Sequence, residues 1–208
     1  YSEFGSSEPD VDDPDALLGF FNVMQDSIEQ GDILAYHDRS DGGLVTTLAE
    51  MSFAGHVGIT AVINDDMLDL DANLNGALFS EELGAVIQVK SELSDRFIEK
   101  FAGAGVPVHK VGRLNSKDTI EFNYKDKTFF SDKRTVLQAA WSETSHRVAV
   151  LRDNAECAEQ EFARVSAPDP GLSANLSFDP SDDISAPYIL KGVKPSKKEQ
   201  ERGRRRRW

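Results

Sequence analysis

Apolar residues at helical spacing predict four helices in this chain. The first is bounded by Asp13-Pro14, an N-cap followed by proline at the first helical position, and by Gly31. The fourth is the longest and spans about residues 132–151. The side chains expected on the apolar faces are Leu17, Phe21, Met24 and Ile28 in the first helix, Leu44, Leu48 and Met51 in the second, Leu93, Phe97 and Phe101 in the third, and Leu137, Trp141, Thr144, Val148 and Leu151 in the fourth.

Shorter apolar segments predict strands between these helices. They lie at about residues 33–37, 57–63, 85–89, 107–114, 118–124 and 127–130. The breaks at 115–117 and 125–126 are short enough for antiparallel hairpins. Because both crossover and hairpin connections are expected, the pattern predicts the α+β class, with a single domain whose mixed β-sheet is covered by helices.

The expected domain covers residues 13–163. Residues 1–12 are polar and acidic, and we expect a flexible lead-in there. Five of the eight prolines lie from Pro168 onward, which predicts an extended wrapping or linker segment over residues 164–193. The remaining residues, 194–208, form a basic tail that we expect to be non-native or disordered.

Charge is distributed unevenly along the chain. The sequence has 36 acidic and 23 basic residues, and the part from Lys191 onward holds nine of the basic residues but only two glutamates. That leaves 34 acidic and 14 basic residues in the first 190. A body this acidic repels a nucleic-acid backbone, so we expect no nucleic-acid partner. No apolar run is long enough to span a membrane, and we expect a cytoplasmic protein without a membrane partner.

The segment Tyr36-His37-Asp38-Arg39-Ser40-Asp41-Gly42-Gly43-Leu44 carries the most chemistry. It joins a predicted strand to a predicted helix, so free helix amides lie beside Gly42 and Gly43, where a ligand can approach closely. Asp38 offers a carboxylate suited to magnesium, and Ser40 offers a hydroxyl suited to phosphate or to the metal's water shell. The segment predicts an anion site or a metal–phosphate site. In the alternative interpretation, Asp41 or Ser40 simply caps the helix.

Several blocks in a fixed order resemble one enzyme family. They are His37-Asp38-Arg39-Ser40-Asp41-Gly42-Gly43-Leu44, Phe79-Ser80-Glu81-Glu82-Leu83-Gly84-Ala85-Val86, Leu151-Arg152-Asp153-Asn154-Ala155-Glu156-Cys157, Asp169-Pro170-Gly171-Leu172 and Ala186-Pro187-Tyr188-Ile189. Together they resemble phosphoribosylformylglycinamidine synthase in its large, single-chain form. The family enzyme is several times longer, so the resemblance implies a fragment of the second half of its synthetase core, similar to the C-terminal domain of aminoimidazole ribonucleotide synthetase.

The resemblance implies a reaction and a site. The family enzyme is an ATP- and glutamine-dependent ligase that converts formylglycinamide ribonucleotide to formylglycinamidine ribonucleotide in purine biosynthesis. In this half of the core, the resemblance implies Asp38 as a ligand of Mg²⁺ and Ser40 as a contact to ATP or ADP, with Gly42 and Gly43 as weaker phosphate-loop candidates. The implied partners are the preceding synthetase domains and the following glutaminase domain of the same polypeptide, which would complete the site. No catalytic residue is expected in this fragment, and we expect it to be inactive alone.

Other polar residues near these blocks have no assigned step. His37 alternates to the strand face opposite Asp38, which favours a packing or hydrogen-bonding role over catalysis. Arg39 is open to two interpretations, a phosphate contact or a surface ion pair. Glu81 and Glu82 receive no role. Cys157 is the only cysteine, which excludes an internal disulfide, and we expect it to be structural.

Two other functions compete with this interpretation. One is a non-catalytic interaction module that combines an acidic domain with a basic tail. The other is a related synthetase or kinase of the same domain type, such as selenophosphate synthetase or thiamine-phosphate kinase. The blocks around Glu81 and Asn154 favour the purine enzyme over both alternatives.

Overall fold

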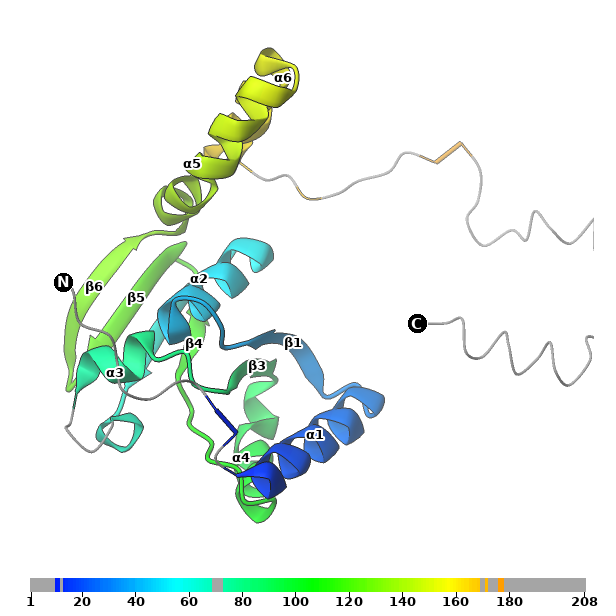
Figure 1. Ribbon diagram of the computed structural model, residues 1–208, viewed down its shortest axis with the longest axis vertical. Coiled ribbons are helices and arrows are strands. Elements are labelled where there is room, and N and C mark those ends of the chain that lie inside the picture. The colour runs from blue at the N-terminus through cyan, green and yellow to red at the C-terminus, as the bar shows by residue number, and fades with distance from the viewer. Residues whose placement is uncertain (1–9, 12, 69–72, 169–170, 172–175, 178–208) are drawn as a thin grey trace, which may run out of the picture. The chain divides into compact units, whose positions relative to one another are not determined.

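Every helix and strand described here lies in the first of two units, residues 1–168 and 169–208 (Figure 1). The computed structural model describes residues 10–11, 13–68, 73–168, 171 and 176–177. In chain order the elements are α1 (Pro14–Glu29), β1 (Ile33–Asp38), α2 (Gly43–Gly55), β2 (Gly58–Ile63), η1 (Asp65–Met67), α3 (Leu74–Phe79), β3 (Ala85–Val89), η2 (Ser91–Leu93), α4 (Ser94–Gly103), β4 (Gly112–Asn115), β5 (Thr119–Tyr124), β6 (Lys127–Lys133), α5 (Arg134–Arg152), α6 (Ala155–Ala163) and η3 (Arg164–Ser166).

The expected α+β class is confirmed, but the strands form two sheets instead of one. β1 and β3 make an antiparallel pair. The second sheet has the strand order β4-β2-β5-β6 and is mixed, because β2 runs parallel to β5 and antiparallel to β4. Most of the expected lead-in and linker and the whole tail lie outside the described residues, so the proposed domain boundaries stay predictions.

Helix α2 covers the four-stranded sheet and builds the larger hydrophobic core. Leu44 and Leu48 are buried as expected, whereas Met51 is only partly buried. The other members of this core come from α2, α3 and the strands, and they are Phe53, Ile59, Ala61, Ile63, Leu78, Ile120 and Phe122. Because α2 also contacts β1, this one helix joins the two sheets.

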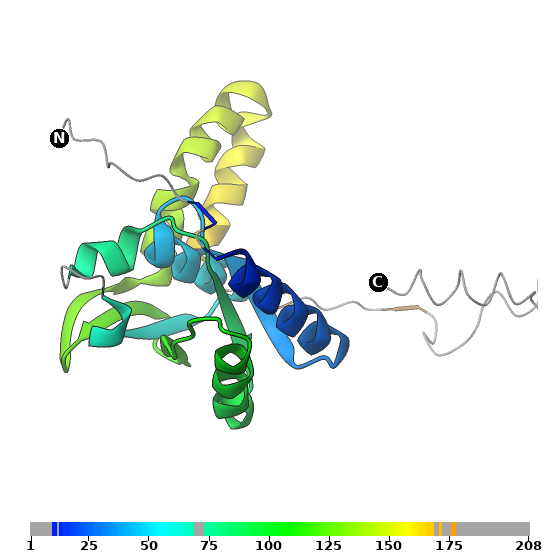
Figure 2. The ribbon, with the colours of Figure 1, turned by 60° about the horizontal axis from the view of Figure 1, so that its bottom comes forward.

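Helix α1 has the predicted ends, but its buried face matches the prediction only at Met24. Asp13 Oδ1 accepts hydrogen bonds of 3.0 Å from two backbone amides of the first turn, and Gly31 follows the helix with a φ of +71°. The buried side packs against α4 through Val23 and Met24 (Figure 2). The expectation was therefore wrong for three side chains, which remain about half exposed: Leu17 (45%), Phe21 (56%) and Ile28 (44%). They lie on the flank of α1 that adjoins the α4 contact.

Helices α5 and α6 lie side by side and extend from the end of β6 (Figure 1). The long helix was expected from residue 132, but Asp132 and Lys133 still pair with β5, so α5 begins at Arg134. Much of its expected apolar stripe is exposed, including Trp141, Val148 and Leu151. The helices α3 and α6 were not predicted, since both are short and neither has a long apolar repeat. The single cysteine, Cys157, is exposed at the start of α6.

The expected hairpin across residues 115–117 does not form. β4 ends with Asn115 opposite Gly58, and β5 starts beside the same end of β2, so β2 lies between the two strands. Residues 116–118 therefore cross over the start of β2. A Cβ atom at Gly58 would lie 2.7 Å from the backbone nitrogen of Thr119 and would also clash with the Asn115 side chain. The crossing depends on the absence of a side chain at Gly58.

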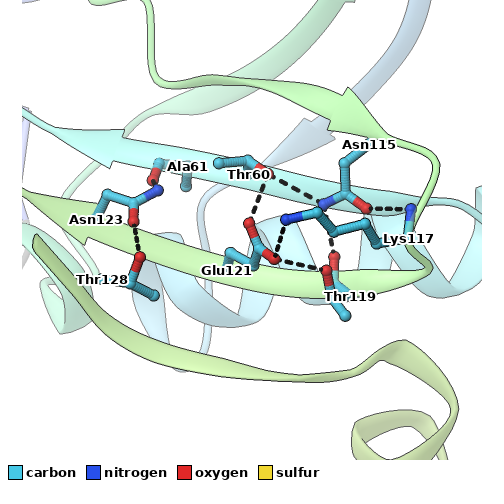
Figure 3. A network of polar contacts seen from close by, with 8 residues as sticks. All are labelled: Thr60, Ala61, Asn115, Lys117, Thr119, Glu121, Asn123 and Thr128. Atoms are coloured by element: carbon cyan, nitrogen blue, oxygen red, sulfur yellow. Dashed lines mark hydrogen bonds and ion pairs between the residues drawn. The ribbon is translucent and has the colours of Figure 1, made fainter. Parts of the chain in front are cut away.

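Polar side chains hold this crossing together (Figure 3). The amide nitrogen of Asn115 donates to the carbonyl oxygen of Thr119 at 3.0 Å and to the hydroxyl of Thr60 at 3.1 Å. The carboxylate of Glu121 accepts from the Thr119 hydroxyl at 3.0 Å and the Thr60 hydroxyl at 3.1 Å, and pairs with Lys117. The bond from Thr119 is the main cause that holds the pKa of Glu121 below its usual value. These residues fix the register of β4, β2 and β5.

The β3–β4 connection also differs from the predicted pattern. A strand was expected over 107–114, but only Gly112–Asn115 pairs with β2. Earlier in this segment, Val106 and Val108 pack against the core between α1 and α4. The apolar residues of this segment thus serve two places. Val106 and Val108 pack in the core between α1 and α4, and Gly112–Asn115 then joins the four-stranded sheet.

We predict that Gly58→Ala destabilises the chain by roughly 1–3 kcal/mol, because the added Cβ meets backbone atoms that cannot move without breaking the sheet. The matched control is Gly103→Ala in the last turn of α4, where no atom lies within 4 Å of the added Cβ. Urea unfolding of both variants measures the difference. Equal stability of the two variants would contradict the proposed close approach.

Candidate functional site

The loop between β1 and α2 has the geometry that its glycines predict. Gly42 is the N-cap of α2 with a φ of +82°, and Gly43 opens the helix with a φ of +65°. The amide of Gly43 donates to the carbonyl oxygen of Ser40 at 2.9 Å, which closes the turn. No side chain caps this helix, so the structure does not support the alternative in which Ser40 or Asp41 serves as a cap.

The polar side chains of this loop are exposed. Asp38, Ser40 and Asp41 all lie at the surface, and none of them has a side-chain hydrogen bond to another group in the described part of the chain. Asp38 and Tyr36 are two residues apart on β1 and so share a face. Burial raises the pKa of Tyr36, and the negative charge of Asp38 raises that pKa further. The carboxylate and the hydroxyl of the motif are thus free to contact a ligand.

A second loop, residues 79–84, packs directly against the two glycines. A Cβ atom on Gly43 would lie 2.7 Å from the carbonyl carbon of Phe79 and 2.8 Å from the carbonyl oxygen of Ser80. The carboxylate of Glu81 accepts the amide hydrogen of Gly42 at 2.8 Å. The Gly42 amide was expected to be available to a phosphate, but in this structure it is bonded to Glu81.

Arg39 fastens the two loops together. Its backbone amide donates to the carbonyl oxygen of Gly84 at 2.7 Å. Its guanidinium donates to the carbonyl oxygens of Glu82 at 2.7 Å and Leu83 at 3.2 Å. Burial lowers the pKa of Arg39 from its usual value, and the charge of Glu82 partly opposes that shift. Neither interpretation offered for Arg39, phosphate contact or surface ion pair, matches these bonds to backbone carbonyls.

His37 points away from Asp38, as the strand alternation predicts. Its Nε2 lies 2.9 Å from a carboxylate oxygen of Glu50 on α2. Its Nδ1 lies 2.7 Å from the carbonyl oxygen of Asp38 and must carry the hydrogen, because a carbonyl oxygen can only accept. These contacts are those of a residue that holds the backbone in place.

The donors at this loop make part of a magnesium–phosphate site. A carboxylate and a hydroxyl are oxygen ligands of the kind that Mg²⁺ and its water shell accept. Among the described residues, no three His, Cys, Asp or Glu side chains stand close enough together to hold a metal ion. Asp38 and Ser40 therefore fit such a site only if further ligands come from outside the described residues.

Sequence reasoning did not identify the contacts of Arg39, Glu81 and Glu50. Arg39 and Glu81 stood inside the two blocks already singled out, yet nothing in their spacing indicated that each would bond to the other loop's backbone. Glu50 lies thirteen residues beyond His37, and only its position on the face of α2 toward β1 relates the two.

Comparison with known proteins decides the family. The model of the family described as AIR synthase related protein, C-terminal domain, matches residues 2–125. The chain belongs to this family. The matched part runs through α1 to β5, so both loops of the candidate site lie inside this AIR synthase-related domain.

Solved structures show the same fold at low sequence identity. The similar structures include PurL of T. maritima in complex with ATP, phosphoribosylformylglycinamidine synthase II of Thermotoga maritima, and T. maritima PurL in complex with AMPPCP. Their identities are 17%, 18% and 19%, with TM-scores of 0.54, 0.54 and 0.53. The alignments cover 62%, 60% and 64% of this chain but only 22%, 22% and 24% of those chains, so this chain spans less than a quarter of their length. None of the helices in the described ranges combines the length and apolar character needed to cross a bilayer.

We predict that Arg39→Lys destabilises the chain by about 1–3 kcal/mol, because an ammonium cannot replace the two-pronged contact of the guanidinium to the carbonyl groups of Glu82 and Leu83. Arg96→Lys on α4 is the matched control. Arg96 is about half exposed and pairs with Gln30 and Asp32, so its replacement should cost less than about 1 kcal/mol. Urea unfolding compares the variants. If both lose the same stability, the guanidinium of Arg39 does not hold the loops together.

Proposed function

We propose that this AIR synthase-related domain is part of a phosphoribosylformylglycinamidine synthase and contributes to a magnesium–nucleotide site. The observation that carries the proposal is the pair Asp38 and Ser40, exposed and unbonded within the described residues, on a glycine turn at the start of a helix. The family match and the fold shared with PurL structures that contain ATP or AMPPCP support the same conclusion.

The proposed roles follow from the chemistry of each group. The carboxylate of Asp38 would bind Mg²⁺, whose charge offsets that of nucleotide phosphates. The hydroxyl of Ser40 would donate to a phosphate oxygen, and the backbone at Gly42 and Gly43 would let a phosphate approach closely. Because Glu81 already holds the Gly42 amide, the two side chains are the stronger part of this proposal and the glycine amides the weaker part.

The proposed reaction belongs to a longer polypeptide. It is the ATP-dependent conversion of formylglycinamide ribonucleotide to the amidine, with glutamine as the nitrogen donor, in the cytoplasm. Preceding synthetase domains would supply the remaining magnesium ligands, and a glutaminase domain would supply ammonia. The alignment with PurL in complex with ATP covers only 22% of the PurL chain, which supports the view that further domains are needed.

We predict that the 208-residue chain alone forms no amidine product and releases no glutamate from glutamine. One magnesium carboxylate and one phosphate contact do not make a complete nucleotide site. The measurement incubates the purified chain with ATP, Mg²⁺, glutamine and the formyl substrate, with a complete synthase as the positive control. Product above the level of a no-protein blank would overturn this part of the proposal.

We also predict that, in the complete polypeptide, Asp38→Asn weakens the retention of magnesium and nucleotide and lowers the melting temperature. A ligand at about 100 times its dissociation constant stabilises a fold by about 2.7 kcal/mol, so its loss is measurable. Asp41→Asn is the matched control, since Asp41 is an exposed carboxylate three residues away that receives no role here. Copurified nucleotide and thermal melting are compared after magnesium loading. Equal nucleotide content and equal melting of wild type and Asp38→Asn would show that Asp38 is only a loop residue.

The interaction-module alternative has one observation in its favour. The apolar side chains Trp141, Val148 and Leu151 are exposed on α5, as on a surface that binds another protein. That alternative expects no nucleotide to copurify with any form of the protein, so the Asp38 experiment separates the two functions.

A further inference from the structure

Glu50 bridges three elements around the candidate site. Its Oε2 lies 2.9 Å from Nε2 of His37, at the end of β1. Its Oε1 accepts the indole N–H of Trp141, on α5, at 2.8 Å. Each carboxylate oxygen therefore has its own partner, and the two partners come from residues far apart in the chain.

This bridge reaches the backbone of the proposed magnesium ligand. The same His37 ring donates from Nδ1 to the carbonyl oxygen of Asp38 at 2.7 Å. The hydroxyl of Thr47, on α2, also lies within 3.5 Å of that oxygen, while its stronger bond goes to Gly43 at 2.9 Å. The peptide group that follows Asp38 is thus held from α2 mainly through His37.

The inner half of this bridge, His37 with Glu50, is largely shielded from solvent. The side chains of His37 and Glu50 are only 27% and 28% exposed. Trp141 is 58% exposed, but its ring packs against Phe53 of α2 with centroids 5.9 Å apart, which orients the indole. Hydrogen bonds among partly buried, well-packed groups restrict the rotamers of all the residues they join.

We infer that Glu50 is a positioning residue for the magnesium–nucleotide site, acting through His37 on Asp38, and that Trp141 fixes its orientation. This inference rests on the proposed function. It assigns Glu50 no contact with metal, nucleotide or substrate. It also gives α5 a role in the site. The indole of Trp141 on α5 bonds to Glu50 on α2, Glu50 bonds to His37, and His37 bonds to the backbone of Asp38.

The test measures the dissociation constant for Mg–ADP in the complete polypeptide, with Glu50→Ala, Glu50→Gln and Trp141→Phe. Glu50→Ala removes both hydrogen bonds and should weaken Mg–ADP binding about tenfold. Glu50→Gln should stay within about twofold of wild type, because the amide oxygen still accepts from the indole and the amide N–H can donate to Nε2 of a His37 ring that is protonated at Nδ1 only. Trp141→Phe loses only the outer bond and should weaken binding about threefold.

The control is Glu143→Ala on α5, an exposed residue whose ion pair with Arg147 lies within the same helix. It should leave Mg–ADP binding unchanged. The melting temperature of each ligand-free variant is measured separately, so that a loss of fold is not mistaken for a loss of positioning.

Three outcomes would overturn the inference. The first is a Glu50→Ala variant that melts lower without ligand yet binds Mg–ADP as wild type does. The second is a Glu50→Gln variant as weak as Glu50→Ala, which would show that the charge matters and not the hydrogen bonds. Third, if Asp38→Asn leaves Mg–ADP binding unchanged, the proposed function fails and this inference fails with it. If Asp38→Asn weakens binding and Glu50→Ala does not, only the positioning role is wrong.

Discussion

The attachment of Arg39 to the backbone of residues 82–84 is the constraint on which the rest of this domain depends. It extends the β1–β3 pairing beyond Asp38 and Ala85, because the Arg39 amide adds one more bond to Gly84. It also places the two loops so close that a glycine is required at position 43. Helix α2 starts at that point, so its direction is fixed by the same contact. Since α2 then covers the four-stranded sheet, the contact of Arg39 contributes to the relation between the two sheets, together with the packing of α2.

The sequence predicted helices and strands well where their ends are set by interactions between residues close together in the chain. The Asp13-Pro14 start of α1 and the strand–glycine–helix order around Asp38 depend on residues within a few positions of each other, and both were confirmed. The buried face of α1 was predicted only in part. Met24 is buried as expected, but Val23 is buried in place of Leu17, Phe21 and Ile28, because the packing partner α4 lies about seventy residues further on. Both flanks of α1 are apolar, and periodicity alone does not distinguish which one meets a partner.

In the candidate site, too, the features set by neighbouring residues were predictable from the sequence, and those set by distant residues were not. The opposite orientations of His37 and Asp38 follow from the period of two along β1, so the sequence was sufficient to predict them. The Glu81 carboxylate at the Gly42 amide and the Arg39 guanidinium at two backbone carbonyl groups could not be predicted, because only the folded chain brings the second loop near. The roles of Asp38 and Ser40 toward metal and nucleotide stay predictions, because they involve groups from elsewhere.

The position of β2 between two strands that are consecutive in the chain has a consequence for how this domain folds. A local β4–β5 hairpin could form early and fast, but here the two strands do not pair with each other. β4 pairs with β2, and β5 pairs with β2 as well as with its neighbour β6. The joining of β4 and of the β5–β6 hairpin to β2, about fifty to sixty residues earlier, therefore needs closure of a long loop. Pairings of this kind raise the contact order and slow the search for the native state. The sheet of this domain is therefore expected to be completed late, after β2 is held in place by α2, and the close approach at Gly58 becomes the last step of its assembly.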